Sequence, residues 1–154
     1  MKKNFWKNKK VFITGHSGFK GSWLTLWLKN LGAKINGYSL KPKKKSLFYE
    51  ANIANGIESN FGNILNFKNL SSEIEKFSPE VVFHLAAQPL VKPSYIDPRK
   101  TFSTNIFGTI NLLESLRNCK NVKSVVIVTS DKVYENKDTK IGYNENDTLG
   151  GYDP

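Results

Sequence analysis

Cysteine is nearly absent from this sequence of 154 residues, which contains Cys119 and no other. A lone cysteine excludes an internal disulfide, and the first residues lead into no apolar stretch of signal-peptide length, so we expect a reducing, cytoplasmic setting. Histidine is also scarce. The two histidines, His16 and His84, lie far from each other and from Cys119 in the sequence, a spacing unlike that of metal ligands. We therefore expect no metal site.

Long hydrophobic runs are missing as well. The longest, Val125-Val126-Ile127-Val128, is far shorter than the about 20 residues of a membrane-spanning helix, so we expect no membrane insertion. Acidic residues are outnumbered, with 13 Asp and Glu against 23 Lys and Arg. The lysines are spread along the chain, and their dense runs at residues 7–10 and 41–45 lack the interleaved aromatic residues of a base-stacking surface. We expect no nucleic-acid partner, and a steep salt dependence of DNA or RNA retention would contradict this.

The sequence does contain enough apolar material for a core, since 39% of its residues are hydrophobic and 12% are aromatic. Short apolar runs typical of buried parallel strands occur at residues 11–13, 34–40, 57–61, 81–85 and 124–129. Segments with helical periodicity lie between them, at residues 21–31, 67–77 and 98–118. This alternation predicts an α/β fold of the doubly wound, Rossmann type, with a parallel sheet and helices on both faces. We expect one domain over residues 1–154.

Two of the helical segments have a clear apolar pattern. In the first, apolar residues recur at spacings of three and four, at Trp23, Leu24, Trp27, Leu28 and Leu31. We therefore expect Trp23 and Trp27 to lie on the buried face of this helix. The segment that begins at Pro98 places a second set on one face, namely Phe102, Ile106, Thr109, Leu113 and Leu116. His84 stands inside an apolar strand, and we interpret it as a core histidine with its hydrogen bonds satisfied.

A glycine-rich turn joins the first strand to the first helix and reads Gly15-His16-Ser17-Gly18-Phe19-Lys20-Gly21. Its three glycines permit a tight bend, let the backbone approach a pyrophosphate without an intervening Cβ, and bring the helix close to the strand. The helix N-terminus adds a partial positive charge. At the first strand–helix junction of an alternating α/β chain this pattern predicts dinucleotide binding rather than an ordinary turn. We take all seven residues as candidate cofactor contacts.

With Ser22-Trp23-Leu24 added, this run resembles the cofactor loop of the CDP-glucose 4,6-dehydratases, a family of extended short-chain dehydrogenases. The resemblance continues in order through nearly the whole chain, at residues 83–89, 94–98, 104–109, 128–136 and 150–154. Many of these segments are common to all extended short-chain dehydrogenases. Dehydratases acting on dTDP- or GDP-sugars usually carry an Asp-Glu pair where this chain has Asp131-Lys132, and the lysine favours the CDP-glucose branch.

The resemblance implies a lyase that converts CDP-glucose to CDP-4-keto-6-deoxyglucose, in nucleotide-sugar and lipopolysaccharide O-antigen biosynthesis. NAD takes a hydride from sugar C4, water leaves across C5 and C6, and the hydride returns to C6. Ser130 matches the family's hydroxyl at the C4 oxygen, Asp131 its acid for the C6 hydroxyl, and Lys132 the position of a glutamate base in related dehydratases. A lysine is a base only when its pKa is depressed, so the role of Lys132 stays open. Without the resemblance, a polar strand-to-loop turn explains these three residues equally well.

The resemblance also implies cofactor contacts at Leu85, Ala86, Ala87, Gln88, Asn105 and Thr129. At two other positions the sequence departs from the pattern. No carboxylate for the adenosine ribose follows the second strand. Ser39 could replace it, while Lys41 or Lys43 could meet a 2′-phosphate, so NADP stays open beside NAD. Asn63, followed by Ile64, stands where the family has an aspartate at the adenine, and an amide can still hydrogen-bond the base.

The family's catalytic Tyr-x-x-x-Lys pair has no counterpart in these residues, because no lysine stands four positions after Tyr134, Tyr143 or Tyr152. We expect the N-terminal part of a longer enzyme, without its last strands and C-terminal substrate domain, and with little activity of its own. A fragment, a truncated gene and half of a split protein stay open. So do two other functions, another nucleotide-sugar epimerase or dehydratase and a catalytically silent dinucleotide-binding module. Family members commonly form homo-oligomers, with residues 98–118 as one interface helix.

Overall fold

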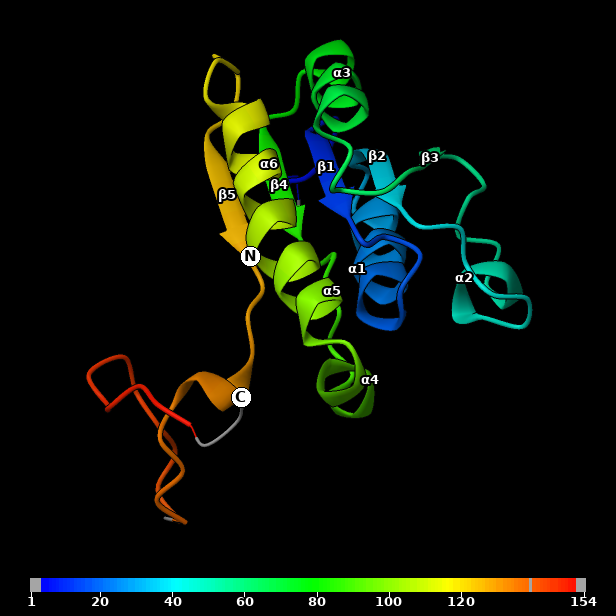
Figure 1. Ribbon diagram of the computed structural model, residues 1–154. Helices are drawn as coiled ribbons and strands as arrows, with labels where there is room; N and C mark the ends of the chain where they lie inside the picture. Colours follow the sequence, from blue (N-terminus) through cyan, green and yellow to red (C-terminus); the bar gives the residue numbers. More distant parts are fainter. Residues whose placement is uncertain (1–3, 139, 152–154) are drawn as a thin grey trace.

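The chain forms one parallel sheet flanked by helices, and the computed structural model describes residues 4–138 and 140–151 of it (Figure 1). The sheet has five strands in the order β3-β2-β1-β4-β5, and each neighbouring pair is parallel. The strands are β1 Lys10–Thr14, β2 Lys34–Ser39, β3 Glu58–Phe61, β4 Val81–His84 and β5 Ser124–Ile127. The predicted doubly wound α/β fold is therefore confirmed.

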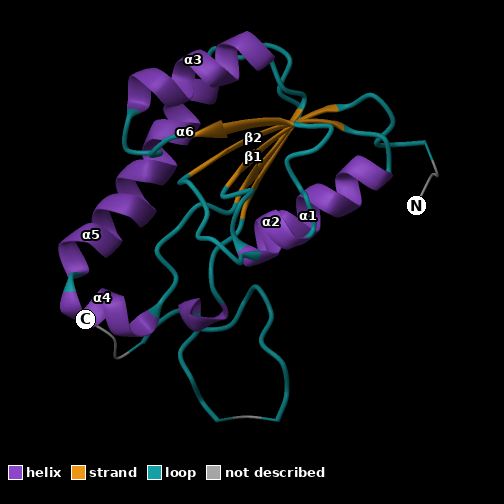
Figure 2. Cartoon of the chain, turned by 90° about the vertical axis from the view of Figure 1, so that its right-hand side faces the viewer, coloured by secondary structure: helices purple, strands orange, loops and turns teal. Residues whose placement is uncertain are grey.

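Helices cover both faces of the sheet, as Figure 2 shows, with α1 and α2 on one side and α3 and α6 on the other. Their bounds are α1 Phe19–Asn30, α2 Leu47–Glu50, α3 Phe67–Phe77 and α6 Gly108–Leu116. Alternate strand residues face opposite sides, which divides the core in two. Phe12 and Val82 belong to one cluster with residues of α3 and α6, while Val11 and Ile13 pack with Leu28 of α1.

The segment before α6 is more irregular than predicted. A short helix, α4 Val91–Ile96, lies in the proline-containing stretch between the predicted strand at residues 81–85 and the predicted helix at residues 98–118. It is followed by α5 Pro98–Phe102, whose N-cap Asp97 accepts a hydrogen bond from the Lys100 backbone N–H, and by the π-helical turn η1 Ser103–Phe107. In the part of the chain that the structure describes, no helix is long and apolar enough to cross a membrane.

The predicted buried face of α1 is wrong. Trp23 and Trp27 are 54% and 55% exposed, and the side of α1 that is buried consists of Gly21, Ser22, Thr25 and Leu28. Small side chains let α1 approach the strands closely, so the large indoles face outward. Phe102, Ile106 and Leu113 are likewise exposed. The π-helical turn winds at more than 3.6 residues per turn, so it changes the phase of the apolar pattern before α6 begins.

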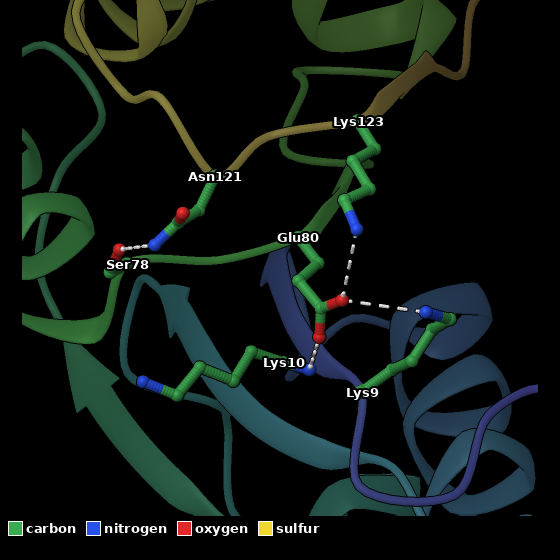
Figure 3. Close-up of polar contacts among 6 residues, drawn as sticks. All are labelled: Lys9, Lys10, Ser78, Glu80, Asn121 and Lys123. Atoms are coloured by element: carbon green, nitrogen blue, oxygen red, sulfur yellow. Dashed lines mark hydrogen bonds and ion pairs between the residues drawn. The ribbon is translucent and has the colours of Figure 1, made fainter.

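A carboxylate joins the starts of three strands at the amino-terminal edge of the sheet (Figure 3). Glu80, directly before β4, accepts a hydrogen bond of 3.1 Å from the backbone N–H of Lys10 at the start of β1. Its other oxygen lies 3.4 Å from Lys9 Nζ and 3.9 Å from Lys123 Nζ, which precedes β5. The loops described next begin at the opposite, carboxyl edge of the sheet.

Candidate functional site

The predicted site residues gather at the carboxyl edge of the sheet. The chain runs outward from β1 through β2 to β3, then returns to β4 on the other side of β1. In open α/β sheets the crevice at such a reversal, beyond the carboxyl ends of the strands, is where ligands bind. The loops that follow β1, β4 and β5 all start at this edge, and they carry most of the residues that the sequence singled out.

The glycine-rich turn after β1 has the geometry that its glycines predict. Gly15 has φ of +74°, and a Cβ there would lie 2.7 Å from the Ala86 backbone nitrogen. A Cβ on Gly21 would overlap the Gly15 carbonyl oxygen. No side chain fits at either position, because β1, α1 and the loop after β4 are in direct backbone contact at this turn. The result is a backbone surface that a phosphate could approach closely.

Helix α1 begins at this turn with features that favour an anion. Its N-cap, Gly18, makes no side-chain capping bond, and no acidic residue stands in the first turn. Lys20 lies there instead and is exposed, as is Phe19. The N-terminal end of a helix carries unpaired N–H groups and a partial positive charge. The start of α1 can therefore accept a pyrophosphate.

His16 lies in this turn, but its ring points into the protein. The residue is 0% exposed, and its Nε2 lies 2.7 Å from the Ser59 hydroxyl of β3. The ring packs edge-on against Phe48 of α2, and a Cβ on Gly37 of β2 would overlap it. Burial lowers the pKa of His16 to about 4, so the ring is neutral at physiological pH. With its ring enclosed, His16 can meet a ligand in the turn through its backbone.

A pair of serine hydroxyls lies at the end of β2, where the sequence lacks the expected acid: Ser39 ends β2, and Ser17 belongs to the glycine-rich turn. Ser39 donates a hydrogen bond of 2.7 Å to the Ser17 hydroxyl, and Ser17 donates one of 3.0 Å to the Leu40 carbonyl. Ser39 is buried, while the lysines that follow at positions 41 and 43 are exposed. The geometry thus links the glycine-rich turn to the end of β2 through hydroxyl groups.

Asn63 and Ile64 follow β3 and differ in exposure. The Asn63 side chain is exposed, and its oxygen accepts a hydrogen bond of 3.0 Å from the Leu65 N–H, which closes a local turn. Ile64 is buried in the core beside Gly108, where a Cβ would overlap its side chain. Asn63 keeps its amide nitrogen for a ligand, whereas the Ile64 side chain packs in the protein interior.

The loop after β4 is held by Asn105 of the π-helical turn. Its side-chain oxygen accepts a hydrogen bond of 2.8 Å from the Gln88 N–H, and its amide nitrogen donates one of 3.2 Å to the Gln88 carbonyl. The Gln88 side chain donates to Leu90 and Thr101. Leu85 and Ala86 both donate backbone hydrogen bonds to Thr14 of β1. The predicted contacts from residue 85 to residue 88 therefore lie beside the glycine-rich turn.

The three candidate catalytic residues follow β5. Ser130 caps the short 3₁₀ turn Asp131–Val133, and its hydroxyl oxygen accepts a hydrogen bond of 3.1 Å from the Lys132 N–H. Thr129 and Lys132 are exposed. Beyond them the chain extends away from the sheet and helices, in both views (Figures 1 and 2). The segment with these residues leaves the sheet at the same edge as the glycine-rich turn. The last part of the predicted match, Tyr152-Asp153-Pro154, lies outside the described residues.

Thr14 and Thr109, which were not predicted as site residues, both bond the buried His84. Thr14 Oγ1 lies 2.6 Å from His84 Nδ1, and Thr109 Oγ1 lies 3.0 Å from His84 Nε2. The interpretation of His84 as a satisfied core histidine is confirmed. The sequence does contain one signal for Thr14: a polar residue that ends a buried strand directly before the first glycine has to find a hydrogen-bond partner nearby.

The fold and the glycine-rich turn define a Rossmann-type domain with the turn that is typical of dinucleotide-binding proteins. The profile of the GDP-mannose 4,6-dehydratase family matches residues 12–154. The chain belongs to this family.

One curated relative is a CDP-glucose 4,6-dehydratase from Salmonella typhimurium, 52% identical over 99% of this chain and 43% of the relative. The predicted resemblance to this group of dehydratases is therefore confirmed, and the chain spans less than half the length of this relative. An epimerase from Methanothermobacter thermautotrophicus has a similar structure, with a TM-score of 0.80 and 31% identity over 94% of this chain and 42% of its own. The structure of MoeE5 in complex with UDP-glucose and NAD matches with a TM-score of 0.75 and 27% identity, over 92% of this chain and 42% of its own.

Proposed function

We propose that the chain is the NAD-binding part of a CDP-glucose 4,6-dehydratase, a cytoplasmic lyase that forms CDP-4-keto-6-deoxyglucose for lipopolysaccharide O-antigen synthesis. The observation that carries this proposal is the glycine-rich turn at the reversal of strand order, in which Gly15 and Gly21 leave no room for a Cβ. The identity of 52% with the Salmonella enzyme supports the choice of CDP-glucose.

The turn fits a dinucleotide. The close backbone approach at Gly15 and the uncapped start of α1 form a cradle for the pyrophosphate, and exposed Lys20 adds a positive charge. Ser39 and Asn63 would meet the adenosine end, and the loop after β4 would line the nicotinamide end beside Thr129. When bound, NAD supplies a temporary acceptor for the hydride that leaves sugar C4 and returns to C6.

The residues after β5 would act on the sugar. Ser130 would hydrogen-bond the C4 oxygen, Asp131 would protonate the departing C6 hydroxyl, and Lys132 would stand near the C5 proton. The reaction balances as CDP-glucose giving CDP-4-keto-6-deoxyglucose and one water, with C4 oxidised and C6 reduced. A base for the C4 hydroxyl proton is still required, and we propose that a Tyr-x-x-x-Lys pair outside these residues provides it.

We propose that the 154-residue chain binds NAD but has little turnover, and that the longer enzyme is a homo-oligomer. An exposed apolar stripe on α5 to α6, including Phe102, Ile106 and Leu113, supports an interface there. The alternative of a catalytically silent binding module makes the same binding prediction. A turnover assay with CDP-glucose distinguishes them once the relative's remaining length is joined to this chain: a dehydratase gains activity, and a silent module does not.

Calorimetric titration of the purified chain with NAD, then with NADP, tests the binding proposal. We expect saturable binding of NAD in preference to NADP. Lys20→Glu should weaken it about tenfold, because a negative charge at the start of α1 opposes a phosphate. Lys68→Glu makes the same charge change at an exposed position in the first turn of α3 and should leave NAD affinity unchanged. Absence of binding in a chain with a folded far-UV spectrum would refute the proposal.

A further inference from the structure

A chain of hydrogen bonds, buried at its centre and exposed at its Asn105 end, crosses the floor of the proposed cofactor site, and His84 lies in its middle. The imidazole is 3% exposed and connects β4 to its neighbours on both sides. On one side Nδ1 lies 2.6 Å from Thr14 Oγ1 of β1, and on the other Nε2 lies 3.0 Å from Thr109 Oγ1 of α6. Each ring nitrogen thus has one hydroxyl partner.

The hydroxyl on the Nε2 side can serve only as an acceptor toward the ring. Thr109 donates its single hydroxyl proton to the Asn105 carbonyl, over 2.7 Å. With that proton used, Thr109 Oγ1 must accept a hydrogen bond from the histidine, and Nε2 must carry the proton. The separation of 3.0 Å agrees with an N–H donor and an oxygen acceptor.

The hydroxyl on the Nδ1 side then has the opposite role. Nδ1 is unprotonated in a neutral ring whose Nε2 is protonated, so it accepts from Thr14. Thr14 Oγ1 also accepts a hydrogen bond of 3.2 Å from the Ala86 N–H. The short separation of 2.6 Å is that of a hydroxyl donor. In the reverse tautomer, the partners of Thr14 Oγ1 in the described residues, His84 Nδ1–H and the Ala86 N–H, would both be donors, so the buried hydroxyl proton would lack an acceptor there, which is costly.

We infer that His84, as the neutral Nε2–H tautomer, is a positioning residue for the cofactor loop. It fixes the direction of one continuous relay, from the Ala86 N–H through Thr14, His84 and Thr109 to the Asn105 carbonyl. Asn105 in turn holds the Gln88 backbone by two hydrogen bonds. The relay therefore holds both ends of the loop after β4, at Ala86 and at Gln88, against β1 and the π-helical turn.

This role rests on the proposed dinucleotide-binding function, since the held loop is the one assigned to the nicotinamide end. Burial lowers the pKa of His84 to about 4, which agrees with a neutral ring. Because the relay runs in one direction, substitutions of Thr109 should differ in their effect. Removing the Thr109 hydroxyl leaves the Nε2–H unpaired, whereas a serine at the same position keeps the acceptor.

Nuclear magnetic resonance of the nitrogen-15-labelled chain tests the tautomer without cofactor. We expect His84 Nε2 to resonate as a protonated, pyrrole-type nitrogen and Nδ1 as an unprotonated, pyridine-type nitrogen, with the assignment made by loss of both signals in His84→Gln. The Ala86 amide should exchange slowly with solvent, and faster in Thr109→Val. A protonated Nδ1 in the wild-type chain would overturn the proposal.

Titration with NAD tests the positioning role. Thr109→Val should bind NAD roughly tenfold more weakly, and Thr109→Ser should restore the affinity. Thr25→Val is the matched control, because the buried Thr25 hydroxyl has no hydrogen-bond partner within the described residues. Equal NAD affinity of Thr109→Val and wild type would overturn the positioning role. If the wild type binds no NAD, the proposed function fails, and the tautomer and the Ala86 exchange still decide whether the relay exists.

Discussion

Both histidines of this chain are buried, and their surroundings keep them neutral. His16 packs among aromatic rings under the glycine-rich turn, and His84 lies between two threonines. Burial lowers the pKa of each to about 4, because it removes the water that would stabilise the charged form. In the unfolded chain they titrate near 6.5. The folded protein therefore resists a protonation that the unfolded chain accepts.

We predict that mild acid destabilises the fold. Between about pH 6.5 and 4 the unfolded chain binds more protons than the folded chain, so the free energy of unfolding falls as the pH falls, by up to about 3 kcal/mol per histidine. Urea unfolding at several pH values across this window measures the loss. His84→Gln cannot titrate, so it should show a smaller pH dependence than wild type. Equal slopes for the two proteins would contradict the prediction.

The contact between His16 and Gly37 gives a second test at the scale of one residue. Gly37 lies inside β2, where a glycine normally weakens a strand, and the His16 ring occupies the place of its missing Cβ. Gly37→Ala should therefore lower the free energy of unfolding by about 1–3 kcal/mol. Gly142→Ala is the control, because a Cβ there meets nothing within 4 Å.

A double-mutant cycle identifies the cause of that loss. In His16→Ala the ring is gone, so the added methyl of Gly37→Ala should cost little in this background. If the cost of Gly37→Ala is the same with and without the ring, strain in the strand rather than the ring contact explains it, and our interpretation of Gly37 is wrong.

At the scale of elements, the sequence predicted where strands and helices lie but not which helix faces are buried. Each expected strand and the helix over residues 67–77 were found, because apolar periodicity and the glycines mark them clearly. In α1, apolar residues occur on more than one side, and Thr25 and Leu28 face the sheet instead of the two tryptophans. The apolar periodicity of a sequence does not show that small residues let a helix approach a sheet closely.

The candidate site was predictable to a similar degree. Glycines that exclude a Cβ leave a direct trace in the sequence, and Gly15 and Gly21 behave as expected. Side-chain contacts between distant segments leave none, so the inward rotation of His16 and the relay through Thr109 needed the structure. The π-helical turn that brings Asn105 to the loop after β4 was also hidden, because its residues fit an ordinary helix.

Glu80 provides a test of how three strands are joined. Its pKa is lowered, first by the hydrogen bond from the Lys10 backbone and also by Lys9 and Lys123. A carboxylate with a lowered folded pKa stabilises the protein above its unfolded pKa, near 4.5, and this contribution is lost as the pH falls through the folded value. Glu80→Gln should cost roughly 1 kcal/mol near neutral pH.

Urea unfolding of Glu80→Gln and of Glu145→Gln measures this contribution. Glu145 is exposed in the segment after β5 and serves as the control for loss of one negative charge. The cost of Glu80→Gln should persist in part at high salt, since the bond to a backbone N–H is less screened than the two lysine contacts. An equal effect of both variants would mean that net charge, and not the junction of the strands, sets the difference.

For the whole molecule, the topology was predictable because it follows from the alternation of elements. Right-handed crossovers between successive strands, with one reversal in the direction in which strands are added, are enough to give this strand order with all strands parallel. The extent of uncovered apolar surface was not predictable. All four residues of β5 are exposed, and α5 to α6 present further apolar side chains to solvent. The chain spans 43% of the length of its Salmonella relative, so we expect the relative's remaining length to contribute to covering this surface.

Cofactor binding should stabilise the whole domain even if, as we propose, the substrate-binding part of the relatives lies outside these residues. At a free NAD concentration of about 100 Kd, mass action adds about 2.7 kcal/mol to the free energy of unfolding. In a domain of this size that should raise Tm by roughly 5–10 °C. CDP-glucose alone should produce no comparable rise, because we propose that the residues that grip its nucleotide lie outside this chain. Thermal unfolding followed by circular dichroism measures both effects. A rise with CDP-glucose as large as that with NAD would place the substrate site within these 154 residues and contradict the proposed division of the enzyme.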